Sequence, residues 1–313
     1  MSATKHQTPL ADLRGKTAFI TGGSSGIGLA IARVCSAAGM KVAFTYRSEK
    51  HRDEALALFP AGNPGVMAIS LDTTDREGFA RAADEVQAKF GNVHLLVNNA
   101  GLGIAIPLSK ATYNDWDWGT GVNIGGVFNG IHTFLPRMQA HGEGAHIVTT
   151  SSSAGLTGGM LGIYVTTKYA LMGMMESLRV ELDGQNIGVS VFAPGLIRTQ
   201  IFDTERNRPK ALQNPGAAAS HGPPPGVPGE PVVDLMAAAR DPMEVAAEVL
   251  EGIRHNDLFI LTHEEFAEVC RERAACLAAS FPREPAPQER VVASRTFVPK
   301  IYAVEAERRG RKG

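Results

Sequence analysis

The stretch Thr21-Gly22-Gly23-Ser24-Ser25-Gly26-Ile27-Gly28 follows a short apolar run and leads directly into a segment rich in Ala, Ile and Leu. This order predicts a tight strand-to-helix turn that cradles phosphates; a turn without a ligand is the alternative. Gly22 can take a positive φ, Gly26 lets the backbone approach a pyrophosphate, and Gly28 lets the helix pack on the strand. The stretch predicts a dinucleotide site, with the phosphates facing the N–H groups at the helix start.

Short apolar runs and longer helical patterns alternate along most of the remaining chain, which predicts successive βαβ units. Each run is almost entirely apolar, as expected for strands that are covered on both faces. The predicted strands are TAFIT from Thr17, KVAFTY from Lys41, VMAIS from Val66, HLLVN from His94, AHIVTT from Ala145, IGVSVFA from Ile187 and DLFILT from Asp257. Helices are expected to start near Gly26, Lys50, Asp75, Thr112, Ile163 and Pro242. The predicted fold is α/β, a single Rossmann-type doubly wound parallel sheet of seven strands with helices on both faces.

The expected domain organisation is simple. Residues 1–12 are predicted to form a flexible N-terminal tail, 13–280 a single catalytic domain, and 281–313 a C-terminal tail that is solvated or embraces a neighbour. Proline and glycine crowd residues 207–231, which excludes a regular helix or strand there. Because this segment follows the sixth predicted strand, we expect a lid insertion at about residues 200–240.

Composition narrows the class of partner. The formal net charge is -1, so there is no basic field for nucleic acid or an anionic membrane, and a small-molecule substrate is expected. The three cysteines lack CxxC spacing and no histidines pair at metal spacing, so no metal is predicted. Without an apolar leader or a run of eighteen apolar residues, a cytoplasmic location is expected.

The end of the second predicted strand bears on cofactor choice. It reads Phe44-Thr45-Tyr46-Arg47-Ser48, with no acid to bond a ribose 2′-hydroxyl. Arg47 beside the Ser48 hydroxyl suits a 2′-phosphate instead. The sequence therefore predicts NADP(H), with NAD(H) as the alternative if Arg47 is only a solvated surface charge.

Tyr164 and Lys168 are four residues apart and lie on one face of a predicted helix. A free tyrosine has a pKa of about 10, which is too high for a base at neutral pH. An adjacent ammonium and an oxidised nicotinamide would both favour the phenolate. The pair therefore predicts a general acid/base, Tyr164, assisted by Lys168.

Four ordered motifs resemble those of the short-chain dehydrogenase/reductase family. They are the TG-x3-G-x-G spacing at 21–28, Asn98-Asn99-Ala100-Gly101, Tyr164-Val-Thr-Thr-Lys168 and Pro194-Gly195-Leu-Ile-Arg-Thr199. The resemblance extends from about Leu13 to Thr262. It implies hydride transfer between a nicotinamide dinucleotide and a carbon bearing oxygen, in a homodimer or homotetramer.

The same resemblance implies roles for further residues. The catalytic serine of the family sits three residues before a glycine, which matches Ser152 and Gly155. The separation of Ser152 from Tyr164 is one residue shorter than in many members of the family, which leaves Ser151 as an alternative. Asn123 matches the helix asparagine that holds a water linking the lysine to solvent. With the glycine loop and Arg47-Ser48 argued above, the predicted cofactor-binding set is Gly22, Ser24, Ser25, Gly26, Ile27, Gly28, Arg47, Ser48, Asp72, Asn99, Ala100, Gly101, Tyr164, Lys168, Pro194, Gly195, Ile197 and Thr199.

The residues flanking these motifs are candidates to line the substrate pocket. They are Leu102, Ile104, Ser153, Met160, Leu161, Ile163, Leu196 and Phe202. This mostly apolar set favours a bulky hydrophobic or aromatic ketone or secondary alcohol. Three segments, at 111–130, 186–201 and 255–266, are also similar to bacterial dehydrogenases that oxidise benzylic Cα alcohols of lignin-derived aryl ethers. A 3-oxoacyl thioester reductase and a non-catalytic NADP(H)-sensing protein remain the alternatives.

Overall fold

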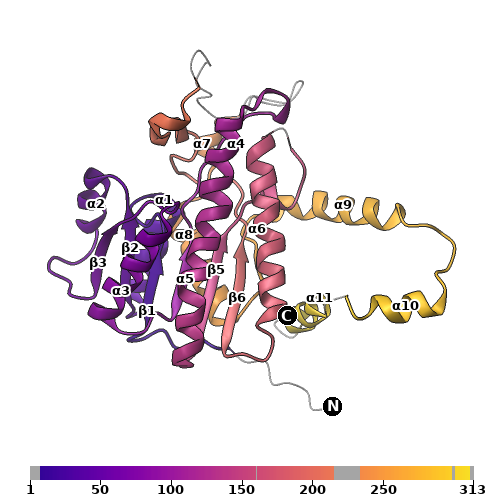
Figure 1. Cartoon of the computed structure of the whole chain (residues 1–313), viewed down its shortest axis with the longest axis horizontal. Helices are drawn as coiled ribbons and strands as arrows, with labels where there is room; N and C mark the ends of the chain where they lie inside the picture. Colours follow the sequence, from indigo (N-terminus) through magenta and orange to yellow (C-terminus); the bar gives the residue numbers. More distant parts are fainter. Residues whose placement is uncertain (1–7, 160, 215–232, 298–299, 311–313) are drawn as a thin grey trace.

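The computed structural model describes residues 8–159, 161–214, 233–297 and 300–310 (Figure 1). Its centre is one seven-stranded sheet in the order β3-β2-β1-β4-β5-β6-β7, and every neighbouring pair is parallel. The strands are β1 Thr17–Ile20, β2 Lys41–Tyr46, β3 Val66–Ser70, β4 Leu95–Asn98, β5 Ala145–Thr150, β6 Ile187–Phe192 and β7 Phe259–Ile260. The predicted doubly wound sheet is confirmed, with the strand order reversing between β1 and β4.

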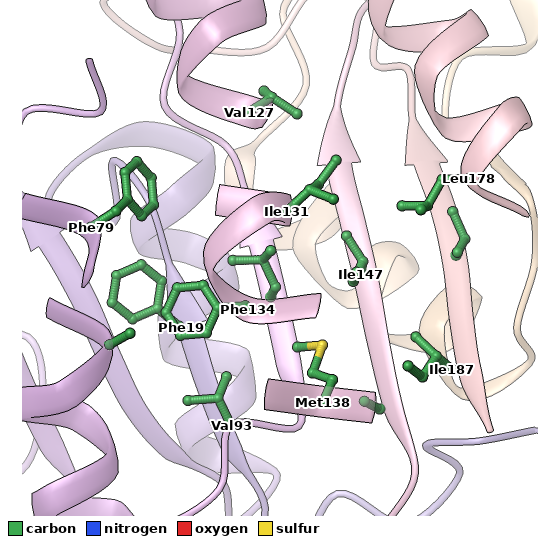
Figure 2. Packing of buried hydrophobic residues seen from close by; sticks show 14 of the residues in the cluster. Phe19, Phe79, Val93, Val127, Ile131, Phe134, Met138, Ile147, Leu178 and Ile187 are labelled. Carbon is green, nitrogen blue, oxygen red and sulfur yellow. The ribbon is translucent and has the colours of Figure 1, made fainter. Parts of the chain in front are cut away.

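Helices cover both faces of the sheet because each strand is apolar on both sides. The main helices are α1 Gly26–Ala37, α2 Glu49–Leu56, α3 Arg76–Phe90, α4 Tyr113–Thr120, α5 Gly126–His141, α6 Gly162–Glu181 and α8 Pro242–Arg254. Phe19 of β1 packs with Phe79 of α3 and Phe134 of α5 on one face (Figure 2). The next residue, Ile20, lies in the opposite core with residues of α1 and α8. This alternation along β1 is the period of two expected of a strand.

Helices α4 and α5 are separated by a single π-helical turn, Gly121–Gly125. The N-terminus of α4 is fixed by a capping box, in which Thr112 and Asp115 bond each other's backbone N–H groups. π-turns are rare and frequently occur at functional sites. The turn sits between two elements that the sequence alone reads as one helix.

Described residues near both ends of the chain pack on the central domain. Leu10 and Leu13 are buried beside α1 and its neighbours, so the core reaches back to residue 10. At the other end, α9 Ala267–Ala279 projects from the body, α10 Gln288–Ser294 follows, and α11 Ile301–Gly310 lies near the end of α6 (Figure 1). The region predicted as a C-terminal tail thus contains two helices.

The insertion after β6 is described only in part. Two short 3-10 turns, Thr204–Asn207 and Lys210–Leu212, precede the gap, and α7 Leu235–Ala238 follows it. Residues 215–232 of the predicted lid lie outside the described residues. In the described part of the chain, no helix is both long enough and apolar enough to cross a membrane.

Candidate active site

A cavity of about 1030 Å³ lies at the carboxyl ends of the strands, where open α/β sheets bind ligands. Its walls come from the loops after β1, β2, β4, β5 and β6 together with the first part of α6. The glycine loop lines one end, and Tyr164 and Lys168 line another part of the same cavity. One continuous space therefore connects the predicted phosphate site with the predicted acid/base.

The glycine loop has the geometry that the sequence predicts. Gly22 and Gly26 have φ values of +63° and +53°, a backbone conformation that residues with a side chain rarely adopt. A Cβ on Gly28 would lie 2.4 Å from the Gly22 carbonyl oxygen, so α1 can approach its strand only with glycine there. The Ser25 side chain makes no capping bond, and the first N–H groups of a helix have no partner within it. The loop and helix start therefore fit a pyrophosphate.

Asn99 joins the ends of three strands beneath the cavity. Its Nδ2 donates to the Thr21 carbonyl over 3.2 Å, its backbone N–H donates to Thr21 Oγ1 over 2.9 Å, and its Oδ1 accepts from the Thr150 hydroxyl over 3.4 Å. These bonds tie β4 to β1 and β5. Asn99 thus fixes the shape of the cavity floor and also contributes to its lining.

At the adenosine end, Arg47 and Ser48 line the cavity but Asp72 does not. The Arg47 guanidinium is about half exposed, and its Nε lies 3.7 Å from Asp72 Oδ2. Its Nη2 donates to the Asn207 carbonyl over 3.3 Å. Asp72 Oδ1 in turn accepts from the Thr74 hydroxyl and N–H. Arg47 is held only loosely by these two contacts, so its charge is accessible to a ligand.

Tyr164 and Lys168 both face the cavity from α6. Lys168 Nζ lies 5.4 Å from the centre of the Tyr164 ring and donates to the Thr150 carbonyl over 2.9 Å. Burial lowers the pKa of Lys168 to about 8. Burial also raises the pKa of Tyr164, and a hydrogen bond with the Ser152 hydroxyl opposes this rise only in part. Burial therefore holds the pKa of Tyr164 above its ordinary value, opposite to the expected shift toward the phenolate, and the phenol keeps its proton at neutral pH.

The neighbouring serines have different partners. Ser152 hydrogen bonds to Tyr164, and its Oγ accepts from the Ala154 N–H over 3.2 Å. Ser151 Oγ donates to the Lys168 carbonyl over 2.8 Å, which fixes it to the backbone of α6. This geometry favours Ser152 as the hydroxyl that acts with Tyr164.

Asn123 is buried in the π-turn between α4 and α5, next to the cavity floor. Its Oδ1 accepts from the Leu102 N–H over 2.8 Å, while its Nδ2 donates to the Leu102 carbonyl and to Thr167 Oγ1, each over 3.0 Å. Thr167 lies on α6, one residue before Lys168. Asn123 therefore ties the loop after β4 to the helix that carries the acid/base.

The predicted substrate residues fall into two groups. Leu102, Ser153, Leu161, Leu196 and Phe202 line the cavity. Ile104 and Ile163 do not line it; they pack with Trp118 in an apolar cluster that also contains the cavity-lining Leu102. Met160 lies outside the described residues.

Most of the remaining residues predicted to bind the cofactor surround the same space. Gly22, Ser24, Ser25, Gly26, Ile27, Ala100, Gly101, Pro194, Gly195, Ile197 and Thr199 all line the cavity. Gly28 instead packs α1 against the strand below. The Thr199 methyl group would lie 3.1 Å from a Cβ on Gly26, so the loop after β6 closes over the glycine loop.

Sequence reasoning missed a support beneath the Pro194-Gly195 loop. His263 Nδ1 accepts from the Gly195 N–H over 3.0 Å, and its Nε2 lies 3.2 Å from the Leu196 carbonyl. A Cβ on Gly195 would lie 2.6 Å from the His263 ring. These partners of the histidine are backbone groups of the loop that lines the predicted cofactor site.

Comparisons with known proteins agree with this arrangement. A family model described as short chain dehydrogenase matches residues 16–210. A C alpha-dehydrogenase of Sphingobium sp. is 37% identical over 264 residues, covering 83% of this chain and 84% of the relative.

Two solved structures are similar over nearly their whole length. One, from Novosphingobium aromaticivorans, has a TM-score of 0.78 and 34% identity, covering 96% of this chain and 99% of the other. The other, a short chain dehydrogenase/reductase from Burkholderia phymatum in complex with NAD, has a TM-score of 0.76 and 32% identity, covering 88% and 99%. The chain therefore belongs to the short-chain dehydrogenase family, whose members are oxidoreductases that act on alcohol and ketone groups with a nicotinamide cofactor.

Proposed function

We propose that this protein is an NADP(H)-dependent oxidoreductase that interconverts a ketone and a secondary alcohol on a bulky hydrophobic, aromatic (benzylic) substrate. The observation that carries the proposal is the single cavity that joins the glycine loop to the Tyr164–Lys168 pair. The proposed catalytic residues are Ser152, Tyr164, Lys168 and Asn123. When bound, the nicotinamide cofactor supplies or accepts the hydride.

In the proposed mechanism, Tyr164 gives its proton to the substrate oxygen during reduction and takes it back during oxidation. The Ser152 hydroxyl, which bonds Tyr164, holds the same oxygen where negative charge develops. Lys168 lies beside the ring and stabilises charge on the phenol oxygen. Asn123 keeps Leu102 and Thr167 in place, so the loop and helix around the proton path do not move apart.

The proposed cofactor preference depends on charge at the end of β2. Tyr46 stands where an acid would bond a ribose 2′-hydroxyl, and Arg47 and Ser48 follow it in the cavity lining. Asp72 is the nearest counter-charge to Arg47, at 3.7 Å, and an exposed pair of this kind is weak. A 2′-phosphate with its larger charge would compete successfully for the guanidinium.

The proposed substrate class rests on the lining of the cavity and on one relative. Leu102, Leu161, Leu196, Ile201 and Phe202 give the space between the acid/base and the insertion an apolar wall. Such a wall favours a hydrophobic ring over a small charged metabolite. The similar Sphingobium protein is named as a C alpha-dehydrogenase, which is consistent with a benzylic alcohol.

Steady-state assays can test both parts of the proposal. We expect NADPH-dependent reduction of propiophenone, with kcat/KM for NADPH well above that for NADH. Arg47→Leu should lower kcat/KM for NADPH by about tenfold or more and leave NADH nearly unchanged, because only the 2′-phosphate needs the guanidinium. The matched control is Arg81→Leu, which removes an exposed arginine of α3 that does not line the cavity.

Three other results of these assays would contradict the proposed cofactor, substrate or catalytic activity. A wild-type preference for NADH would exclude the NADP(H) assignment. Turnover of a 3-oxoacyl thioester without any turnover of aryl ketones would exclude the aromatic substrate. Tight NADPH binding without activity on a broad carbonyl panel would instead indicate a sensor.

A further inference from the structure

A buried arginine in the insertion after β6 forms a cluster that the motifs do not include. Arg208 has only 7% of its side chain exposed. Its Nη2 donates to Asp115 Oδ1 over 2.7 Å, and its Nε donates to Glu205 Oε2 over 2.6 Å. Its Nη1 donates to the Leu212 carbonyl over 3.1 Å. One guanidinium therefore ties both ends of a short chain segment to the start of α4.

The carboxylate of Asp115 is shared between α4 and this segment. Its Oδ2 accepts from the Thr112 N–H and hydroxyl, which caps α4, and its Oδ1 accepts from Arg208 and from Asn214 Nδ2. Burial alone would raise the pKa of Asp115, but the bonds from Thr112, Arg208 and Asn214 outweigh it and lower the pKa. The carboxylate is thus ionised and fully engaged.

The guanidinium also stacks on an aromatic ring that reaches toward the catalytic residues. Arg208 Cζ lies 4.3 Å from the centre of the Trp118 ring, and Trp118 packs with Leu102 and Ile163. The backbone of Leu102 bonds both Oδ1 and Nδ2 of Asn123, and Ile163 directly precedes Tyr164. The cluster therefore rests on the same apolar layer that supports the acid/base.

The segment that Arg208 holds forms one wall of the cavity. We define residues 201–214 as the wall segment; it contributes Ile201, Phe202, Thr204, Arg206, Asn207, Arg208 and Pro209 to the lining. Thr204 Oγ1 accepts from the Gly103 N–H over 2.9 Å, which fixes the beginning of the wall segment to the loop after β4. The Arg208–Asp115 contact is the buried anchor of its middle part. The end of the segment is attached to α4 as well, because Asn214 bonds Asp115 and Thr112 and the Gln213 carbonyl accepts from Asn114. The Asn207 carbonyl accepts from Arg47 at the adenosine end of the cavity.

We propose that Arg208 is a positioning residue that, through Asp115 and Trp118, holds the wall segment against α4 and so sets the room available to the substrate. Arg208 does not take part in proton or hydride transfer. Its loss should therefore affect bulky substrates, which need the wall, more than small ones, which do not. This substrate part of the inference rests on the proposed ketone reductase function.

The test compares Arg208→Met with Lys210→Met, which removes an exposed cation from the same wall segment. Methionine still covers Trp118, so the apolar layer is preserved. With NADPH, R208M should raise KM for propiophenone by about tenfold and change KM for butanone by less than about threefold, while K210M changes neither. A parallel loss of kcat for both ketones, with both KM values unchanged, would overturn the inference.

A double-mutant cycle identifies the partner. If Arg208 acts through Asp115, Asp115→Asn combined with R208M should raise the KM for propiophenone little more than R208M alone, because the interaction is already lost. Arg208→Lys keeps the charge but not the planar fork, so it should restore part of the affinity. Fully additive effects would contradict the proposed pair.

Hydrogen exchange provides a readout that does not depend on substrate identity. R208M should accelerate amide exchange in peptides covering residues 201–214, whereas peptides from β4 and β5 should keep wild-type rates. Exchange unchanged in residues 201–214 would overturn the inference even if aryl ketones prove not to be substrates. Failure of propiophenone turnover with accelerated exchange would instead count against the proposed function alone.

Discussion

At the scale of single residues, the hydroxyl groups of two adjacent serines have different hydrogen-bond partners. Ser152 bonds Tyr164, whereas Ser151 also lines the cavity but donates its hydroxyl proton to the Lys168 carbonyl. Ser152→Ala should lower kcat by about 100-fold, because a group that stabilises charge on the substrate oxygen is lost. Ser151→Ala should instead lower the free energy of unfolding by about 1 kcal/mol, the usual net worth of one buried hydrogen bond.

Steady-state kinetics and urea denaturation of both serine variants check this assignment. The two variants control for each other, since they remove the same group from neighbouring positions. A large loss of kcat in the Ser151 variant with a nearly normal Ser152 variant would reverse the roles.

The lowered pKa of Lys168 predicts that activity declines at alkaline pH. Burial lowers its pKa to about 8, so its ammonium is lost well below the pH at which an exposed lysine would lose it. If the charge of Lys168 assists Tyr164, kcat/KM for reduction should be constant below this pKa and fall as the pH rises through it. Tyr164 titrates higher, because burial raises its pKa.

The profile should be measured between about pH 6 and about pH 10, with Lys168→Arg as the comparison, since a guanidinium stays charged throughout. If the variant retains measurable activity, its alkaline limb should move upward. A wild-type rate that stays flat well above the Lys168 pKa would rule out a role for the ammonium.

At the scale of elements, the sheet could be predicted because its signal is local. Each strand is an apolar run, and helix starts carry local signals of their own, such as Asp241-Pro242, where Asp241 caps α8. The last strand was predicted too long: β7 contains only Phe259 and Ile260, because only these two residues pair with β6. The sequence therefore predicted where the strands lie more accurately than how long they are.

The site motifs were predictable for the same local reason, but the cavity walls were not. Ile104 and Ile163 flank predicted catalytic motifs in sequence, yet their side chains are buried with Trp118 and do not line the cavity. The Arg208–Asp115 contact joins residues 93 positions apart, and nothing in the chain near either residue signals the pairing. The direction of the Tyr164 pKa shift likewise depends on burial, which only the folded site determines.

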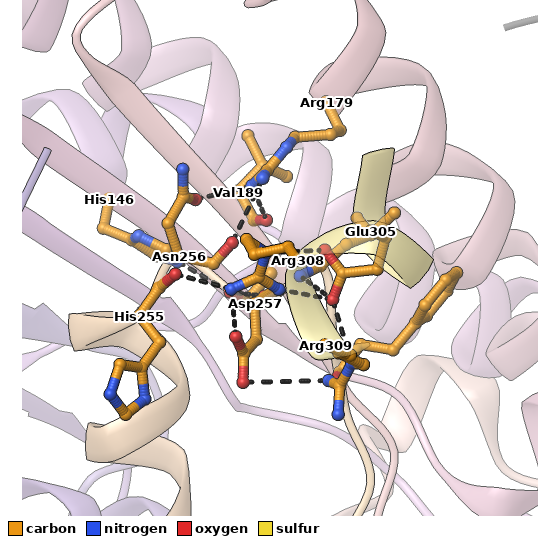
Figure 3. A network of polar contacts seen from close by, with 12 residues as sticks. His146, Arg179, Val189, His255, Asn256, Asp257, Glu305, Arg308 and Arg309 are labelled. Atoms are coloured by element: carbon orange, nitrogen blue, oxygen red, sulfur yellow. Dashed lines mark hydrogen bonds and ion pairs between the residues drawn. The ribbon is translucent and has the colours of Figure 1, made fainter. Parts of the chain in front are cut away.

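At the scale of the whole molecule, a buried polar network attaches the C-terminal helix to the catalytic domain (Figure 3). Arg308 of α11 bonds Glu305, Asp257 and the His255 carbonyl, and the latter two residues lie just before β7. Glu305 Oε1 also accepts from the Leu258 N–H over 3.2 Å. This contact is at the amino end of β7, whereas the cavity lies at the carboxyl ends of the strands.

The network predicts that Arg308 contributes to stability and not to catalysis. Arg308→Met would leave the buried carboxylates of Asp257 and Glu305 without their main cation, with Arg309 as the remaining positive charge near both. The free energy of unfolding should fall by about 3 kcal/mol, the lower end of the cost of breaking a buried ion pair. Urea denaturation would measure it, with Arg290→Met on exposed α10 as the control. KM for NADPH should stay at its wild-type value in both variants. An Arg308 variant as stable as the Arg290 variant would show that α11 is not held by this network.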